Sequence, residues 1–109
     1  MSKLVRDNIP TFIKSSGKIP IYHVEENLDK RYKRLVNKLV EEAKEVKDSE
    51  DDNEFLHEMA DVYEVVITLL RFMGYTLNDV QEQAKSKRAI KGSFDKFIIL
   101  DRVKEVKPK

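Results

Sequence analysis

The sequence predicts a mainly α-helical domain with a small β element. Apolar residues recur at steps of three and four over two long segments, and a glycine follows the end of each of three predicted helices. Two short runs rich in β-branched and aromatic residues, at 19–24 and 97–103, predict the β element. Because 109 residues are the size of one small domain, we expect a single domain over residues 1–109.

The first two predicted helices lie in the N-terminal half. A short helix follows the cap-like pair Asp7-Asn8, has Pro10 in its first turn and ends before Gly17. A long helix covers residues 28–48, because its apolar residues form a stripe on one side. The members of this stripe are Leu28, Tyr32, Leu35, Val36, Leu39, Val40, Ala43 and Val46.

Two further helices follow a polar break at residues 49–53, in which Asp52 or Asn53 is the expected cap. The third helix covers residues 54–73 and is apolar on most sides. We therefore expect it to be buried within a bundle or between subunits. The fourth helix covers about residues 77–90 and has a thin apolar face.

The β element consists of the runs at 19–24 and 97–103, near the two ends of the chain. Neither run is long enough to be stable by itself. We therefore expect the N- and C-terminal segments to pair with each other or with another subunit.

Composition excludes several classes of protein. The absence of cysteine excludes disulfide scaffolds, thiolate zinc sites, iron–sulfur clusters and cysteine nucleophiles. The N-terminus has no apolar signal-peptide core, and the longest apolar run is only residues 97–100, so we expect a cytoplasmic protein without a membrane span. A net charge of +1 disfavours a general nucleic-acid binder.

The small net charge conceals a segregation of charge. Acidic side chains dominate residues 41–84, whereas basic side chains dominate both ends of the chain. Such an arrangement suits a site that holds metal ions on carboxylates and an anion on basic groups. A solvated surface with clustered charges is the alternative. Nucleic-acid binding through the basic residues 85–109 is the less favoured interpretation, because Phe94 and Phe97 there more plausibly fill a core.

Five acidic residues are the main candidates for a functional site. They form a Glu-Glu-x-x-Glu motif on the 28–48 helix and a Glu-x-x-Asp motif on the 54–73 helix. Residues three apart share one face of a helix, so each helix offers a pair of carboxylates one turn apart. An antiparallel pairing of the helices brings the two pairs together. The residues are Glu41, Glu42, Glu45, Glu58 and Asp61.

The chemistry of these carboxylates predicts a divalent cation. Glu58 points into the apolar arc of its helix, and no Lys or Arg precedes Arg71 on that helix. Carboxylates in an apolar setting need a counter-charge, and all-oxygen ligation favours Mg²⁺ or Mn²⁺. The alternative is an ordinary charged face in which Glu41 pairs with Lys44 or Lys47.

Two rival metal sites fit the sequence poorly. A di-iron bundle needs two Glu-x-x-His motifs, and only Glu54 with His57 makes one. A zincin helix needs a second His where this chain has Asp61. We therefore interpret His57 as a surface or interface residue rather than as a ligand.

The ordered motifs resemble the MazG-like all-α nucleoside triphosphate pyrophosphohydrolase superfamily. Its small phosphoribosyl-ATP pyrophosphohydrolase-like branch is similar in the opening Lys-Leu-Val-Arg-Asp-Asn-Ile-Pro of residues 3–10. It is also similar in the late Lys-Arg-Ala-Ile-Lys-Gly-Ser-Phe of residues 87–94. The resemblance covers nearly the whole chain and implies a helical bundle of the all-α NTP pyrophosphatase type.

The resemblance implies Mg²⁺-dependent cleavage between the α and β phosphates of a nucleoside triphosphate, with release of a monophosphate and pyrophosphate. It implies that Glu41 is the water-activating base. Metal ligands would be Glu42, Glu45, Glu58 and Asp61. Phosphate-binding residues would be Lys87, Arg88 and Lys91, with Lys3 and Arg6 as weaker candidates.

The resemblance also implies a homodimer or homotetramer, which suits the apolar third helix. A house-cleaning role on nucleoside triphosphates is the main functional interpretation. The alternatives are phosphoribosyl-ATP hydrolysis and a non-catalytic helical adaptor that binds a nucleotide or a partner.

Overall fold

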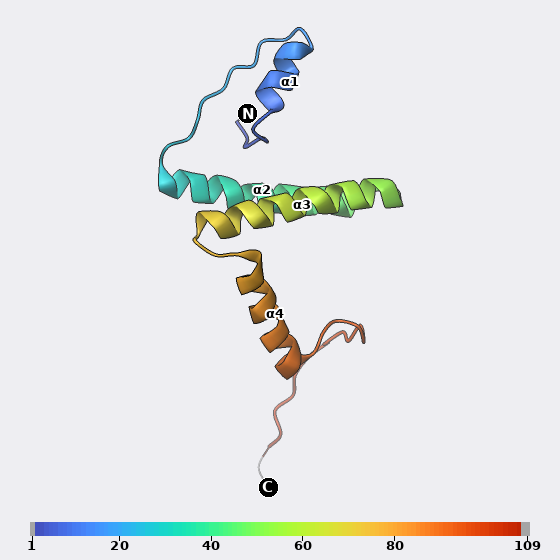
Figure 1. Cartoon of the computed structure of the whole chain (residues 1–109). Helices are drawn as coiled ribbons and strands as arrows, with labels where there is room; N and C mark the ends of the chain where they lie inside the picture. The colour runs from blue at the N-terminus through green and yellow to red at the C-terminus, as the bar shows by residue number, and fades with distance from the viewer. Residues whose placement is uncertain (1, 108–109) are drawn as a thin grey trace. The chain divides into compact units, whose positions relative to one another are not determined.

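A computed structural model describes residues 2–107 and contains four helices in that range (Figure 1). They are α1 (Ile9–Ser15), α2 (Leu28–Asp48), α3 (Asp52–Phe72) and α4 (Leu77–Lys91). The prediction of a mainly α-helical protein is confirmed. The bounds of α2 agree with the predicted 28–48, and those of α3 and α4 differ by one or two residues.

Side-chain caps fix where the two long helices begin. Asn27 caps α2, because its side-chain oxygen accepts a hydrogen bond from the Lys30 amide at 3.0 Å. Asp51 caps α3 in the same way through the Glu54 amide at 2.8 Å. Glu54 in turn accepts from the Glu50 amide at 2.9 Å. The cap is therefore one residue before the predicted Asp52 and two before the predicted Asn53, and the helix starts earlier as well.

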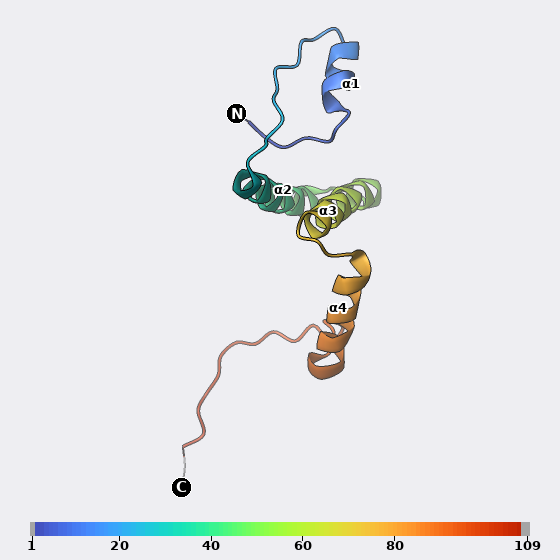
Figure 2. The same cartoon turned by 60° about the vertical axis from the view of Figure 1, so that its left-hand side comes forward.

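Helices α2 and α3 form an antiparallel hairpin and lie side by side (Figures 1 and 2). A turn of three residues, 49–51, joins them and forces the second helix back along the first. Leu35 is the buried apolar residue of the described chain, and Glu42 is its buried polar residue. The hairpin thus places a carboxylate at one of the two buried positions among residues 2–107.

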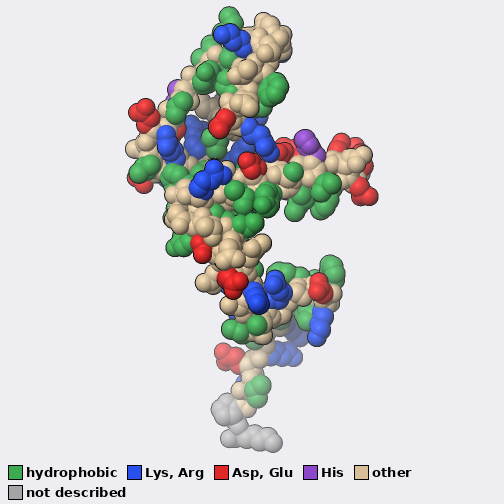
Figure 3. Space-filling model, viewed as in Figure 1, with side chains coloured by type: hydrophobic (Ala, Val, Ile, Leu, Met, Phe, Trp, Pro, Cys, Tyr) green, Lys and Arg blue, Asp and Glu red, His purple; other side chains and the backbone are tan. Residues whose placement is uncertain are grey.

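The long apolar helix is less covered than expected. No residue of α3 is buried in the chain by itself, and the side chains of Leu56 and Tyr63 are 70% and 55% exposed. Apolar side chains are visible at the surface of the hairpin in Figure 3. The expected burial of this helix inside a bundle is therefore not found within one chain.

The predicted β element is wrong: residues 2–107 contain no strand. In the first run, Ile19 and Ile21 are 88% and 97% exposed. The second run starts at Phe97, whose φ of +50° breaks the extended backbone and whose amide donates to the Phe94 carbonyl at 3.1 Å. β propensity reports how well a side chain fits a pleated, half-buried surface, and neither run has such a surface to join.

The chain divides into two compact units at the start of α4, between Leu77 and Asn78. The first unit contains α1 and the α2–α3 hairpin, and the second contains α4 and the residues that follow. The single domain over residues 1–109 stays a prediction. Within residues 2–107, none of the helices has the length and apolar character that crossing a bilayer requires.

Candidate functional site

The hairpin brings the two acidic motifs together. Counting back from the turn at 49–51, Glu42 on α2 lies across from Glu58 on α3. The charges of Glu42 and Glu45 both act on Glu58, although they lie on the other helix. Carboxylates of the two neighbouring helices thus lie close enough in the first unit for their charges to interact.

We define Glu42, Glu45, Glu58 and Asp61 as the acidic cluster. Within this cluster, the carboxyl group of Glu58 lies among the negative charges of the other three residues. Its side chain is half-buried, and this partial removal from water raises the pKa of the carboxyl above its ordinary value. The negative charges of Asp61, Glu45 and Glu42 raise the pKa further, and only His57 acts in the opposite direction. A positive ion at Glu58 would relieve both effects.

Three side chains of α3 form a compact group of ligand atoms. One nitrogen of His57 and one carboxylate oxygen each from Glu58 and Asp61 lie within 4.8 Å of one another. His57 is exposed, as predicted, yet it belongs to this group. Its spacing of four residues from Asp61 was the signal in the sequence, because residues four apart share a helical face.

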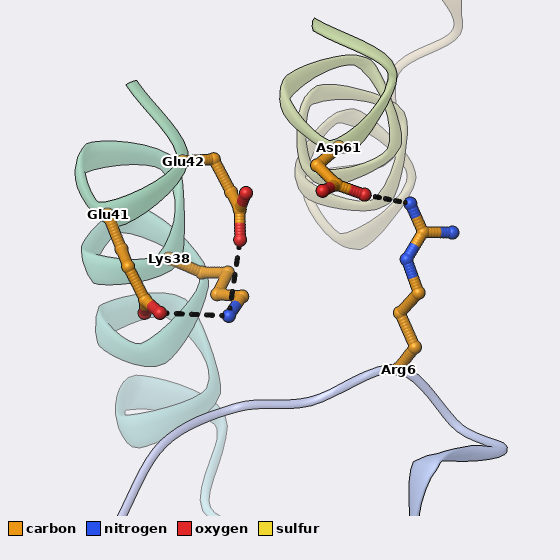
Figure 4. Close-up of polar contacts among 5 residues, drawn as sticks. All are labelled: Arg6, Lys38, Glu41, Glu42 and Asp61. Atoms are coloured by element: carbon orange, nitrogen blue, oxygen red, sulfur yellow. Dashed lines mark hydrogen bonds and ion pairs between the residues drawn. The ribbon is translucent and has the colours of Figure 1, made fainter. Parts of the chain in front are cut away.

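Glu42 has a counter-charge on its own helix. Its side chain is buried, and the Lys38 ammonium lies 3.3 Å from its Oε1 atom (Figure 4). The same ammonium donates to Glu41 Oε1 at 3.3 Å. Lys38, rather than Lys44 or Lys47, is therefore the partner of Glu41. A buried carboxylate is stable here because a neighbouring cation holds it.

A second counter-charge comes from the N-terminal arm, which we define as residues 2–8. The Arg6 guanidinium donates to Asp61 Oδ1 at 2.6 Å and so joins the arm to α3 (Figure 4). This hydrogen bond raises the pKa of Arg6, as do the charges of Asp61, Glu64 and Glu42. Arg6 was predicted as a phosphate ligand, but in this structure its partner is a predicted metal ligand.

The other predicted site residues are more exposed. Glu45 is exposed on α2, and Glu41 is half-buried beside Lys38. Lys3 is exposed on the N-terminal arm. The predicted phosphate ligands Lys87, Arg88 and Lys91 are exposed at the end of α4, in the second unit of the chain. Their roles stay predictions.

The donor set fits a divalent cation. Carboxylate oxygens are the ligands that Mg²⁺ and Mn²⁺ prefer, and Glu58 and Asp61 offer two of them close together. Glu42 and Glu45 add negative charge from the facing helix. The chain itself supplies part of the counter-charge, because Lys38 pairs with Glu42 and Arg6 pairs with Asp61.

Comparison with known protein families identifies the family of this chain. The model of the phosphoribosyl-ATP pyrophosphohydrolase family matches residues 5–88, which include both acidic motifs together with Lys87 and Arg88. No curated protein and no solved structure matches the chain. Because the match spans more than three quarters of the sequence, the chain belongs to the phosphoribosyl-ATP pyrophosphohydrolase family, a family of phosphoanhydride hydrolases within the MazG-like all-α superfamily.

Proposed function

We propose that the protein is a divalent-metal-dependent pyrophosphohydrolase that cleaves the α–β phosphoanhydride of a nucleotide. The observation that carries this proposal is the convergence of Glu42, Glu45, Glu58 and Asp61 from the two helices of the hairpin. Family membership supports the reaction class. Phosphoribosyl-ATP is the favoured substrate, since the family bears its name.

The acidic cluster would hold the metal, chiefly through Glu58 and Asp61. When bound, Mg²⁺ supplies positive charge that polarises the α phosphorus and lowers the pKa of a water molecule. Arg6 occupies Oδ1 of Asp61, so the carboxylate would ligate through Oδ2 alone unless Arg6 moves away. That movement is inexpensive, because an exposed ion pair contributes at most about 1 kcal/mol.

Glu41 is the proposed general base. Its half-buried carboxylate is adjacent in sequence to Glu42 and shares the Lys38 ammonium with it. Glu41 accepts a proton from the attacking water as the water oxygen bonds to the α phosphorus. The bond from the α phosphorus to the bridging oxygen breaks, and pyrophosphate leaves with the electron pair. The second product is the nucleoside monophosphate.

The test is an assay with Mg²⁺, phosphoribosyl-ATP and a panel of NTPs and dNTPs in ¹⁸O-labelled water. We expect pyrophosphate as the released product and the label in the monophosphate. Release of orthophosphate would refute the proposed bond cleavage. The substrate with the highest kcat/KM decides between the two alternatives. Phosphoribosyl-ATP would confirm the favoured substrate, whereas an ordinary or modified triphosphate would indicate a house-cleaning role.

We also propose that the protein forms a homodimer or homotetramer. One buried apolar residue in the described part of the chain is too small a core for a domain of this size. An open apolar groove of about 240 Å³ lies along α2 and α3, and a second copy of the hairpin would cover it. Light scattering on the purified protein tests the oligomeric state. The lining residues are Leu39, Val66, Leu69, Leu70, Met73 and Tyr75.

A further inference from the structure

A cavity with charged side chains in its lining reaches Glu41, next to Glu42 of the acidic cluster. It has a volume of about 260 Å³ and lies between the N-terminal arm and α2. Residues 2–4 of the arm line one side of this arm pocket. Arg34, Asn37, Lys38 and Glu41 line the other side. Steps of three and four separate these α2 residues, so they occupy one face of the helix.

A hydrogen bond between its two walls stabilises the arm pocket. Arg34 Nη1 donates to the Ser2 carbonyl at 3.2 Å, which fixes the beginning of the arm against α2. The ion pair of Arg6 with Asp61 fixes the arm a few residues later, on α3. The arm is thus attached to both helices of the hairpin, and the pocket belongs to the first unit alone.

The lining is rich in cations. Lys3, Arg34 and Lys38 contribute three positive charges, against the single carboxylate of Glu41. Within residues 2–107, neither Lys3 nor Arg34 forms an ion pair with an acidic side chain. Asn37 adds an amide group that can donate to an anion. The chemistry of this lining selects a group with several negative charges.

The charges change sign along α2. Arg34 and Glu41 are seven residues apart, which corresponds to about 10 Å along the helix axis. Beyond Glu41 the same helix presents Glu42 and Glu45. An extended polyanion beside α2 would therefore have one end at the carboxylates that hold metal and the other at the cations of the arm pocket.

We propose that the arm pocket binds the β and γ phosphates of the substrate, which leave together as pyrophosphate. This inference rests on the proposed function and assigns the leaving group of that reaction to a place in the structure. The planar Arg34 guanidinium can donate two parallel hydrogen bonds to one phosphate. When a cation occupies the acidic cluster, the Lys38 side chain can move its ammonium group away from Glu42 and pair with the same phosphates.

The test is calorimetric titration of the full-length protein with inorganic pyrophosphate, in EDTA so that no divalent ion bridges the two. We expect Arg34→Gln and Lys3→Gln each to weaken pyrophosphate binding by about tenfold or more, because each removes a charged donor. Lys47→Gln is the matched control. It removes an exposed charge from the same helix, about 20 Å along the axis, and should change binding less than twofold.

Arg34→Gln also breaks the bond to the Ser2 carbonyl, so a weaker arm attachment alone could lower affinity. Lys3→Gln leaves that bond intact and separates the two effects. Arg34→Lys keeps the charge but loses the planar fork, and should give intermediate affinity. Melting curves of each variant confirm that the fold survives.

Three results would overturn the proposal. The first is that the wild-type protein does not bind pyrophosphate. The second is that both Arg34→Gln and Lys3→Gln bind pyrophosphate with wild-type affinity. The third is that these substitutions weaken the binding of ribose 5-phosphate more than the binding of pyrophosphate. The last result would assign the arm pocket to the phosphoribosyl end of a substrate. Failure of the proposed function looks different: no hydrolysis of any nucleotide, with pyrophosphate binding still dependent on Arg34 and Lys3.

Discussion

The two acidic motifs differ in how their charge is neutralised. On α2, Glu41 and Glu42 share the Lys38 ammonium, and the Glu42 side chain is buried. On α3, Arg6 neutralises Asp61, whereas Glu58 has no ion-pair partner among residues 2–107 and lies among like charges. Each motif has one carboxylate without an ion-pair partner in this range, Glu45 on α2 and Glu58 on α3. Glu45 is exposed to water, whereas Glu58 is half-buried among negative charges.

This difference indicates at which carboxylate the binding of a cation is most favourable. Binding at Glu42 displaces Lys38 and loses an existing ion pair, whereas binding at Glu58 relieves repulsion that the folded chain already carries. The α3 motif is therefore the expected entry point of the metal. The α2 motif contributes structure and, through Glu41, the proposed base.

The largest expected effect follows from removing the charge of Glu58. Glu58→Gln should lower the hydrolysis rate by about a hundredfold or more, because the acidic cluster loses its main electrostatic reason to bind metal. Initial rates of pyrophosphate release measure the loss. Glu26→Gln is the control, since it neutralises an exposed glutamate that precedes α2 and should keep full activity. Wild-type turnover in Glu58→Gln would remove this residue from the site.

The next effect concerns the α2 motif and stability. Lys38→Met leaves the buried Glu42 carboxylate without its cation and should lower the free energy of unfolding by about 2 kcal/mol. Urea denaturation measures this loss. Lys33→Met, at an exposed position on the same helix, should change stability by less than about 0.5 kcal/mol.

A double variant separates a lost partner from lost packing. Lys38→Met combined with Glu42→Leu removes both charges, so most of the stability should return. If Lys38→Met alone is as stable as the wild type, Glu42 is hydrated in solution and the contrast between the two motifs disappears.

A smaller effect is expected at the ion pair between the arm and α3. Arg6→Gln removes a cation that competes with metal for Asp61 and should strengthen Mn²⁺ binding by up to about fivefold, which corresponds to the roughly 1 kcal/mol of an exposed ion pair. Electron paramagnetic resonance of free Mn²⁺ measures the affinity. Weaker Mn²⁺ binding in Arg6→Gln would instead make Arg6 a residue that positions the Asp61 carboxylate.

The smallest effect is a change of metal-free stability with pH. Folding raises the pKa of Glu58, so the protonated side chain stabilises the folded state. This stabilisation is fully present below the ordinary glutamate pKa of about 4.3 and is lost as the pH rises through the pKa of Glu58 in the folded protein. Metal-free Glu58→Gln should therefore melt slightly above the wild type at neutral pH, with a difference that vanishes in acid. A lower melting temperature at neutral pH would contradict this sign.

Much of the helical structure follows from local sequence. The 28–48 stripe, the glycines after three helices and the polar turn at 49–51 act within a few residues, and the structure agrees with them. The β runs failed because a strand needs a partner that local sequence cannot supply. The pairing of the acidic motifs was also predictable, because a short turn between two long helices leaves them antiparallel.

The tertiary structure decided which charges compensate the carboxylates. The sequence placed a lysine three and four residues before Glu41 and Glu42, but the burial of Glu42 depends on contacts with α3. The contact between Arg6 and Asp61 spans 55 residues, and no local periodicity reports it. Sequence alone determined that the acidic residues share helical faces. Only the fold determined which of them are neutralised, because electrostatic interactions depend on distance in space and on exclusion of water.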